Sequence, residues 1–183
     1  MKTANEMYQY SVNNGFGKGA NETYSLNHFK IIEQNLSADE EVLMTFIGLH
    51  NYESTFKHNN NHAYAITNKR ILMAQQKVFG AFFQSVLLDN LNDITFQSGV
   101  IWGVITIDTI KEKFNVGANI VEAKNINQKI HDVLQSARKP VSNNTQASQK
   151  SLAEQLKDLK ELLDLEILTE DEFNEQKEKL LKN

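Results

Sequence analysis

Three histidines are the residues in this chain whose type and spacing come nearest to a chemical site. His50, His58 and His62 fall within one polar stretch between two apolar segments, and neutral imidazole is a common ligand of zinc and nickel. The spacing of His58 and His62 would align two ligands only on a helix, and the intervening Asn59-Asn60-Asn61 favours a loop. No acidic or sulfur partner completes the set. We therefore expect a solvated hairpin loop, with no metal and no cofactor.

Other residue combinations that carry chemistry are absent from the sequence. The chain has no cysteine, which excludes disulfides, thiolate metal sites and a cysteine nucleophile. It has no Gly-x-Ser-x-Gly elbow, and Gly15-Phe16-Gly17-Lys18-Gly19 lacks both the spacing of a phosphate loop and a preceding strand. Asp89 and Asp93 lie beside turns, where aspartate is a routine local acceptor. We predict no catalytic residues and no enzyme activity.

Composition predicts one ordinary domain with a small appendage. The chain has 183 residues, of which 40% are hydrophobic. Its first residues contain no apolar signal core, and the longest apolar run, Val100 to Ile107, is far shorter than the roughly 18 residues of a membrane helix. We expect a soluble, cytoplasmic protein.

The charge is unevenly placed along the chain. Residues 1–149 carry 13 basic and 13 acidic side chains, whereas residues 150–183 carry 6 and 10 and so account for the net charge of −4. A neutral body with an acidic tail argues against general nucleic-acid binding, which requires a basic face. We expect no nucleic-acid partner.

The middle of the chain has the pattern of short strands separated by turn residues. Alternating or continuous apolar runs recur at close intervals, which is typical of a small antiparallel barrel or sandwich. Thr67-Asn68-Lys69-Arg70 separates the first two of these runs, and Asn tolerates the positive φ of a tight hairpin. The strands expected are 42–49, 62–67, 70–74, 82–88, 94–97, 100–102, 104–108 and 111–116.

Two helices flank this region, and an irregular segment precedes it. Residues 1–25 show no sustained period, so we expect a flexible arm. A helix capped by Ser25 is predicted from the spacing of Phe29, Ile32 and Leu36. A second helix begins near Asn119, with Glu122 as its capping partner, and ends before Lys139-Pro140. Its apolar stripe, suited to covering the sheet, is Ala123, Ile126, Ile130, Val133, Leu134 and Ala137.

Residues 26–138 resemble the bacterial pleckstrin-homology (PH)-like family in its YokE-like branch. The resemblance rests on the Thr67-to-Arg70 hairpin, the segment from Leu87 to Thr95, Gly99 and Gly103, and the closing amphipathic helix. It implies a strongly bent antiparallel barrel of about seven strands capped by that helix. It also implies an interaction module without catalytic residues.

The C-terminal segment changes character twice. Residues 139–150 contain the only proline and have the composition of a linker. Residues 151–183 predict a helical hairpin, with a capping box from Thr169 to Glu172. This hairpin resembles the SHOCT family, a short C-terminal domain of many bacterial and phage proteins, although Glu166 stands where that family commonly has glycine. The matching residues are Leu156, Leu159, Leu162 or Leu163, Asp164, Ile167, Leu168, Thr169, Glu172, Phe173, Lys177 and Leu180.

The fold class expected is therefore α+β, mainly β: a PH-like antiparallel barrel capped by a helix, with a small C-terminal helical hairpin. We expect a non-catalytic interaction or scaffold protein that self-associates or binds a protein partner through the tail. The tail residues expected at that contact are Leu152, Leu156, Leu159, Leu163, Phe173 and Leu180. The alternative is a peripheral membrane protein that contacts phospholipid or another anion, weakly, through Lys57, Lys69, Arg70 and Lys77.

The tail hairpin generates the first prediction. A unit of this length lies below the roughly 40 residues at which a domain usually folds without metal or disulfide, so its leucine face needs another surface. Changing Leu159 and Phe173 together to Asp should lower the solution mass of the full chain, measured by light scattering, or abolish partner capture. The circular dichroism of the strands should be unchanged. A monomeric wild-type chain whose pull-downs match those of the double variant would contradict the prediction.

Overall fold

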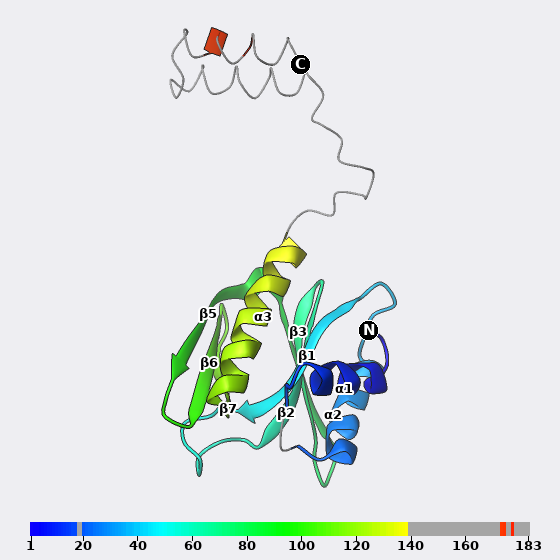
Figure 1. Cartoon of the computed structure of the whole chain (residues 1–183). Helices are drawn as coiled ribbons and strands as arrows, with labels where there is room; N and C mark the ends of the chain where they lie inside the picture. The colour runs from blue at the N-terminus through cyan, green and yellow to red at the C-terminus, as the bar shows by residue number, and fades with distance from the viewer. Residues whose placement is uncertain (18–19, 139–172, 175–176, 178–183) are drawn as a thin grey trace. The chain divides into compact units, whose positions relative to one another are not determined.

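The apolar runs between residues 42 and 119 form one seven-stranded antiparallel sheet in the computed structural model (Figure 1). Its spatial order is β4-β3-β2-β1-β7-β6-β5, so every two strands that pair are consecutive in the sequence, except β1 and β7. The strands are β1 (Val42–His50), β2 (Asn61–Thr67), β3 (Arg70–Gln76), β4 (Ala81–Leu87), β5 (Leu91–Ser98), β6 (Trp102–Thr109) and β7 (Lys113–Asn119).

The predicted fold class is confirmed, with one strand corrected. The sheet curls into a half-barrel, and α3 (Ile120–Arg138) packs on its inner side against β5, β6, β7 and β1. The expected strand at residues 100–102 is wrong, because Ser98 pairs with Gly103 and residues 99–101 form the β5–β6 turn. A 3-10 turn, η1 (Leu88–Asn90), joins β4 to β5.

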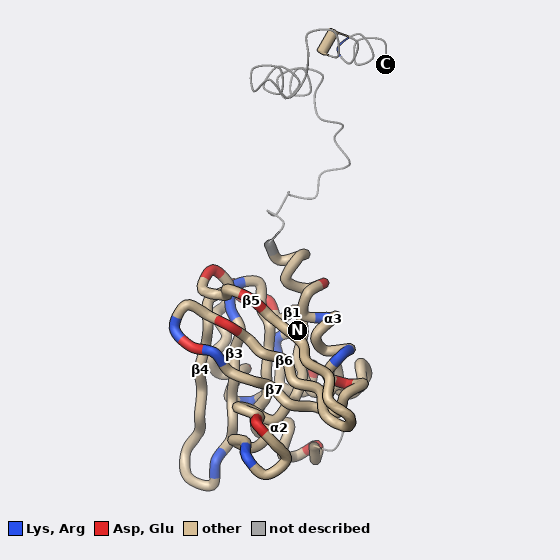
Figure 2. Tube along the Cα trace, turned by 90° about the vertical axis from the view of Figure 1, so that its left-hand side faces the viewer, with Lys and Arg blue, Asp and Glu red and all other residues tan. Residues whose placement is uncertain are grey.

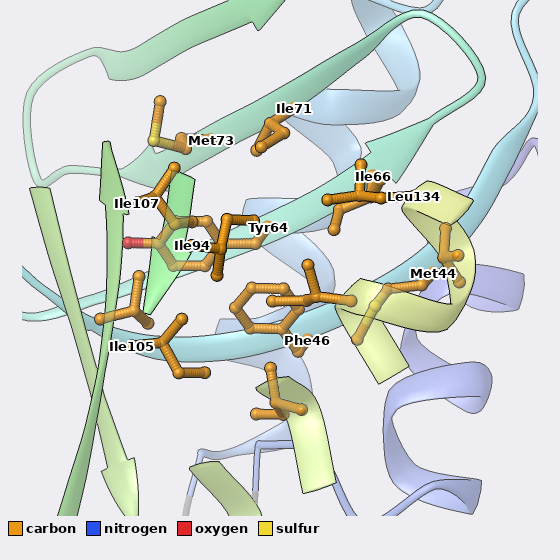
Figure 3. Close-up of a cluster of buried hydrophobic side chains, with 14 of the residues drawn as sticks. Met44, Phe46, Tyr64, Ile66, Ile71, Met73, Ile94, Ile105, Ile107 and Leu134 are labelled. Carbon is orange, nitrogen blue, oxygen red and sulfur yellow. The ribbon is translucent and has the colours of Figure 1, made fainter. Parts of the chain in front are cut away.

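The inner face of the sheet and α3 enclose the main hydrophobic core (Figure 3). Phe46 of β1 and Tyr64 of β2 lie at its centre, with their rings stacked 4.8 Å apart. Around them Figure 3 shows apolar side chains from both halves of the sheet, together with Leu134 of α3. The predicted stripe of the C-terminal helix faces this core: Ala123, Ile126, Ile130, Val133 and Leu134 are buried. This confirms that the helix covers the sheet.

The β2–β3 hairpin has the predicted position but a different cause. Asn68 does not adopt a positive φ; the non-glycine residues that do, among those described, are Asn51 and Asn60. The turn is instead held by Thr67, whose Oγ1 accepts hydrogen bonds from the amides of Lys69 (3.1 Å) and Arg70 (2.9 Å). The turn is therefore stabilised by hydrogen bonds to a threonine side chain, and not by an asparagine with a positive φ as expected.

The N-terminal segment differs from the expected flexible arm. Residues Ala4–Asn13 form α1, which opens with a capping box between Thr3 and Glu6. Met7 is fully buried, and its carbonyl accepts a 2.7 Å hydrogen bond from Thr45 Oγ1 of β1. The second helix, α2 (Glu22–Gln34), is capped by Asn21 rather than by Ser25. The segment is ordered because it has a surface to cover.

That surface is the outer face of β1–β3. β2 and β3 are buried along nearly their whole length, which means that both faces of these strands are covered. α1 packs on β1, while α2 packs on β2 and β3, opposite α3 (Figure 1). The apolar side chains in this second cluster are Ala4, Met7, Phe29, Ile31, Ile32, Val42, Ile47, Ala63, Ala65, Leu72 and Ala74. The barrel therefore lies between two helical layers.

The structure describes residues 1–17, 20–138, 173–174 and 177. The chain divides into two units, Met1–Lys139 and Pro140–Asn183. The expected linker at 139–150 and most of the expected hairpin at 151–183 lie outside the described residues. Of the tail, Phe173, Asn174 and Lys177 are helical, and Lys177 Nζ lies 5.8 Å from the centre of the Phe173 ring.

The two-sided burial of the sheet gives the second prediction. Met7→Ala should lower the free energy of unfolding by about 2–5 kcal/mol, because it removes a fully buried side chain between α1 and β1. Urea denaturation measures this change. Gln9→Ala, on the exposed side of α1, is the matched control and should leave the midpoint almost unchanged. Equal midpoints for all three proteins would mean that α1 does not contribute to the folded domain.

Candidate functional site

A cavity lies where the β1–β2 loop (51–60) and the β3–β4 loop (77–80) leave the sheet. We call these two loops and the residues that border the cavity the loop end. The cavity holds about 740 Å³ and is also bordered by Gln84 of β4 and Glu112 of the β6–β7 loop. The side chains of Gln84 and Glu112 are hydrogen bonded to each other, which fixes the far wall of the cavity.

Two buried histidines form the inner wall of this cavity. His50 is the last residue of β1 and His62 is the second residue of β2. Their rings lie 4.4 Å apart, and His50 Nδ1 is 2.7 Å from the hydroxyl of Tyr64. The ring of Phe82 on β4 meets His62 edge-on at 5.2 Å. The imidazoles therefore lie in a mainly aromatic environment.

This environment keeps both imidazoles neutral. Burial, together with the smaller effect of the neighbouring His50, lowers the pKa of His62 to about 4. Burial also lowers the pKa of His50, and it raises the pKa of the Tyr64 hydroxyl well above its ordinary value. Near neutral pH the inner wall of the cavity therefore offers uncharged hydrogen-bonding groups rather than a cationic pocket.

The structure brings together two of the three histidines considered as metal ligands. His58 lies apart from the pair on the β1–β2 loop, where its Nδ1 accepts a 3.0 Å hydrogen bond from the amide of Asn60. Across the described residues, no group of three or more His, Cys, Asp or Glu side chains is placed to hold a metal ion. The hairpin-loop interpretation fits His58, whereas His50 and His62 are buried strand residues.

The tips of both loops carry exposed apolar side chains, which sequence reasoning missed. Phe56, in the β1–β2 loop, is 99% exposed, and Val78 and Phe79, in the β3–β4 loop, are each 92% exposed. The sequence did contain a signal: Phe56 stands alone in a polar loop, and Val78-Phe79 directly precede Gly80, whose φ is positive.

The four basic residues proposed for anion or lipid contact do not gather in one place. Lys57 and Lys77 lie at the loop end, where Lys57 pairs with Glu53 at 2.5 Å and Lys77 Nζ lies 5.7 Å from the centre of the Phe82 ring. Lys69 and Arg70 lie in the β2–β3 hairpin, at the opposite end of the same strands. Figure 2 shows Lys and Arg spread over separate loops and interleaved with Asp and Glu.

Arg70 belongs to a buried ion pair. Its Nε and Nη2 donate to Glu40 at 2.9 and 2.8 Å, and Nη2 also donates to the carbonyl of Asn35. Glu40 is fully buried. Burial alone would raise the pKa of Glu40, but the hydrogen bonds from Arg70, the Ser37 amide and Thr67 outweigh it and hold that pKa below its ordinary value. Arg70 therefore fastens the connection between α2 and β1 to the β2–β3 hairpin.

Residues 36–135 of the chain match the family model described as a bacterial PH domain. The match covers more than half of the chain and spans all seven strands and most of α3. The chain belongs to the bacterial PH domain family. Membership confirms the PH-like part of the sequence prediction. The YokE-like branch and the SHOCT tail stay predictions.

Solved structures of low identity are also similar to this bacterial PH domain protein. The N-terminal PH domain of Vps36 shares 14% identity at a TM-score of 0.42, over 55% of this chain and 83% of that chain. The hSac2 domain from human phosphoinositide phosphatase Sac2 shares 15% at 0.41, over 60% and 82%. The linker-DH/PH domains of p115-RhoGEF share 10% at 0.40, over 72% and 38%.

Comparison with curated proteins gives no match for this bacterial PH domain protein. Within the described part of the chain, no helix is both long and apolar enough to cross a membrane.

The ion pair between Arg70 and the buried Glu40 gives the third prediction. Arg70→Ala should lower the free energy of unfolding by about 3 kcal/mol, because it leaves the buried Glu40 carboxylate without its cation. The neighbouring Lys69→Ala removes only an exposed pair with Asp39 and should unfold at nearly the wild-type urea concentration. If the two variants lose the same small amount of stability, Arg70 does not have this structural role.

Proposed function

We propose that this bacterial PH domain protein is a non-catalytic interaction module that docks through its loop end. The observation that carries the proposal is the exposure of Phe56, Val78 and Phe79 on two loops that border one cavity. Large apolar side chains that project into solvent on neighbouring loops mark interaction surfaces, since an isolated soluble domain gains nothing from exposing them.

The chemistry of the cavity supports binding rather than catalysis. Its inner wall consists of neutral imidazoles and aromatic rings, and one nitrogen of His50 is engaged by the buried hydroxyl of Tyr64. At the rim, Gln75 Nε2 donates to the backbone carbonyls of Asn59 and Asn61 at 3.1 and 3.2 Å. These groups are used to hold the loop in place. The proposal therefore assigns the cavity to positioning the loops and the loop tips to contact.

The tail completes the proposed module. Its sequence supports a SHOCT-like hairpin, at residues 151–183, that brings copies or partners together, with the linker at 139–150 as a tether. Multivalency is the physical benefit, because a second weak contact on the same chain raises the apparent affinity of the first. In this arrangement the loop end selects the partner and the tail raises the local concentration.

Site-specific photocrosslinking tests the docking proposal and is the fourth prediction. A photoreactive phenylalanine at Phe56 or Phe79 of the full chain, in its native cells, should give discrete protein adducts. The matched control is the same residue at Val100, which is 95% exposed on the β5–β6 turn. That turn borders a separate cavity, beside Tyr52 and Trp102. Adducts of equal yield from all three positions, or none from the two loop positions, would count against docking through the loop end.

An anionic membrane surface is the second candidate partner. The observation that favours it is the placement of Lys57 next to Phe56 and of Lys77 next to Val78, since lysine beside an exposed apolar side chain suits the boundary between headgroups and acyl chains. Two lysines supply little attraction, however, because each contributes about 1 kcal/mol near an anionic surface, and Lys57 is already paired with Glu53.

The fifth prediction follows from this small charge. Sedimentation with phosphatidylglycerol-containing vesicles at physiological salt should give weak or no binding. The variant Lys57→Ala/Lys77→Ala should behave like the wild type, and so should the control Lys69→Ala. Strong binding that is lost in Phe79→Ser but kept in Val100→Ser would show instead that the loop end is a membrane-binding surface.

A further inference from the structure

The β1–β2 loop is attached to the sheet by a histidine on each side. His50 ends β1 and His62 lies one residue inside β2, so the loop from Asn51 to Asn60 leaves and re-enters the sheet beside the two packed imidazoles. The residues at the two ends of the loop, Asn51 and Asn60, have φ of 50° and 62°. Asparagine tolerates this region, so each end of the loop can turn sharply away from its strand.

The hydrogen bonds that close the base of the loop also involve His50 and His62. The amide of His50 donates to the carbonyl of Asn60 at 3.0 Å, and the amide of Asn59 donates to the carbonyl of His50 at 2.7 Å. His62 Nδ1 lies 3.2 Å from the carbonyl of Asn60. The closed loop and the packed imidazole pair are therefore one structural unit.

Apart from the Asn60 carbonyl beside His62 Nδ1, which favours a proton there, the groups that face the pair do little to stabilise added positive charge. Phe82 of β4 and Phe114 of β7 contact the rings, and Tyr64 Oη meets His50. The other basic groups nearby are His28 of α2 and Lys77, and both disfavour a proton on His62. Glu112 is the one carboxylate that borders the cavity among the described residues, and its Oε1 already accepts a hydrogen bond from Gln84. His58, on the loop itself, lies outside the pair.

We propose that the imidazole pair is an acid-sensitive latch: protonation of His50 and His62 opens the base of the β1–β2 loop and moves Phe56 relative to the β3–β4 tip. Two imidazolium rings whose centres lie 4.4 Å apart in an apolar wall repel each other. This repulsion decreases when the loop opens and water reaches the rings. The inference rests on the function proposed above, because it concerns control of the loop end. Its test follows the loop alone and needs no partner.

The direction of the effect follows from proton linkage. The imidazoles take up protons near pH 6.5 once the loop is open, but His62 does so only near pH 4 while it is closed. The open form therefore binds more protons, and the closed form is favoured above about pH 6.5. As the pH is lowered between these two values, protonation of His62 should decrease the ratio of closed to open loop by up to about tenfold per pH unit. The decrease should be larger where His50 is protonated over the same range.

Amide hydrogen exchange on the full chain, read residue by residue by NMR, tests the latch between about pH 7.5 and about pH 5. The probes are the amides of His50 and Asn59, with the β2–β3 core strands as an internal reference. We expect the protection factors of the two loop-base amides to fall at least tenfold on acidification, while those of the core strands hold. The variants His50→Gln and His62→Gln should reduce this fall. The matched controls are His58→Gln, on the same loop, and His131→Gln, exposed on α3; both should keep it.

Three results would overturn the proposal. These are unchanged loop-base protection at the lower pH, an acid effect that persists in the His50→Gln/His62→Gln double variant, or equal loss of protection in the core strands. If the variants do not fold, the wild-type imidazole resonances decide. Their titration must coincide with the loss of Asn59 protection, and titration without that loss refutes the latch. A refuted latch leaves docking through the loop end intact, since crosslinking measures docking independently.

Discussion

The rest of the structure depends on the burial of β2 and β3 on both faces. A sheet with one apolar face needs one cover, but these strands carry Tyr64, Ile66, Ile71 and Met73 on one side and Ala63, Ala65, Leu72 and Ala74 on the other. Removing both faces from water is the main favourable term in folding such a sheet. It requires α3 inside the half-barrel and α1 and α2 outside it. The N-terminal helices are therefore structural parts of the domain rather than an arm attached to it.

The two ends of these strands have different roles. At the hairpin end, Thr67 organises the turn and Arg70 joins it to the buried Glu40, so these three polar side chains have partners within the fold. At the loop end, the neutral imidazole pair holds the loops, while the apolar tips are left in solvent. One end thus keeps the layers together, and the other leaves apolar side chains in solvent.

The parts of the fold that follow a regular period could be predicted from the sequence, and the parts that depend on tertiary partners could not. The apolar stripe of α3 and the alternation of side chains in β2 could be recognised in the sequence, because residues on the same face of each element recur at a regular spacing. α1 gave no such signal, since its buried side includes Ala4 and the polar Ser11, which bonds to Thr45 only in the folded domain. The positions of the four basic residues could not be predicted, because charge along a sequence does not say that Arg70 turns toward Glu40. The exposed tips were missed because the sequence of a loop does not show whether its phenylalanine packs on the core or projects into solvent.

Docking through the loop end is tested most directly by measuring whether the tips are covered in cells. The chain has no cysteine, so single variants Phe56→Cys, Phe79→Cys and Val100→Cys each carry one thiol at a site that is exposed in the isolated protein. A permeant thiol reagent should label all three at similar rates in the purified protein. In native cells the account predicts slower labelling at positions 56 and 79 than at position 100, whatever the partner is. Equal labelling of the three positions in cells would show that the loop end is unoccupied and would contradict the account.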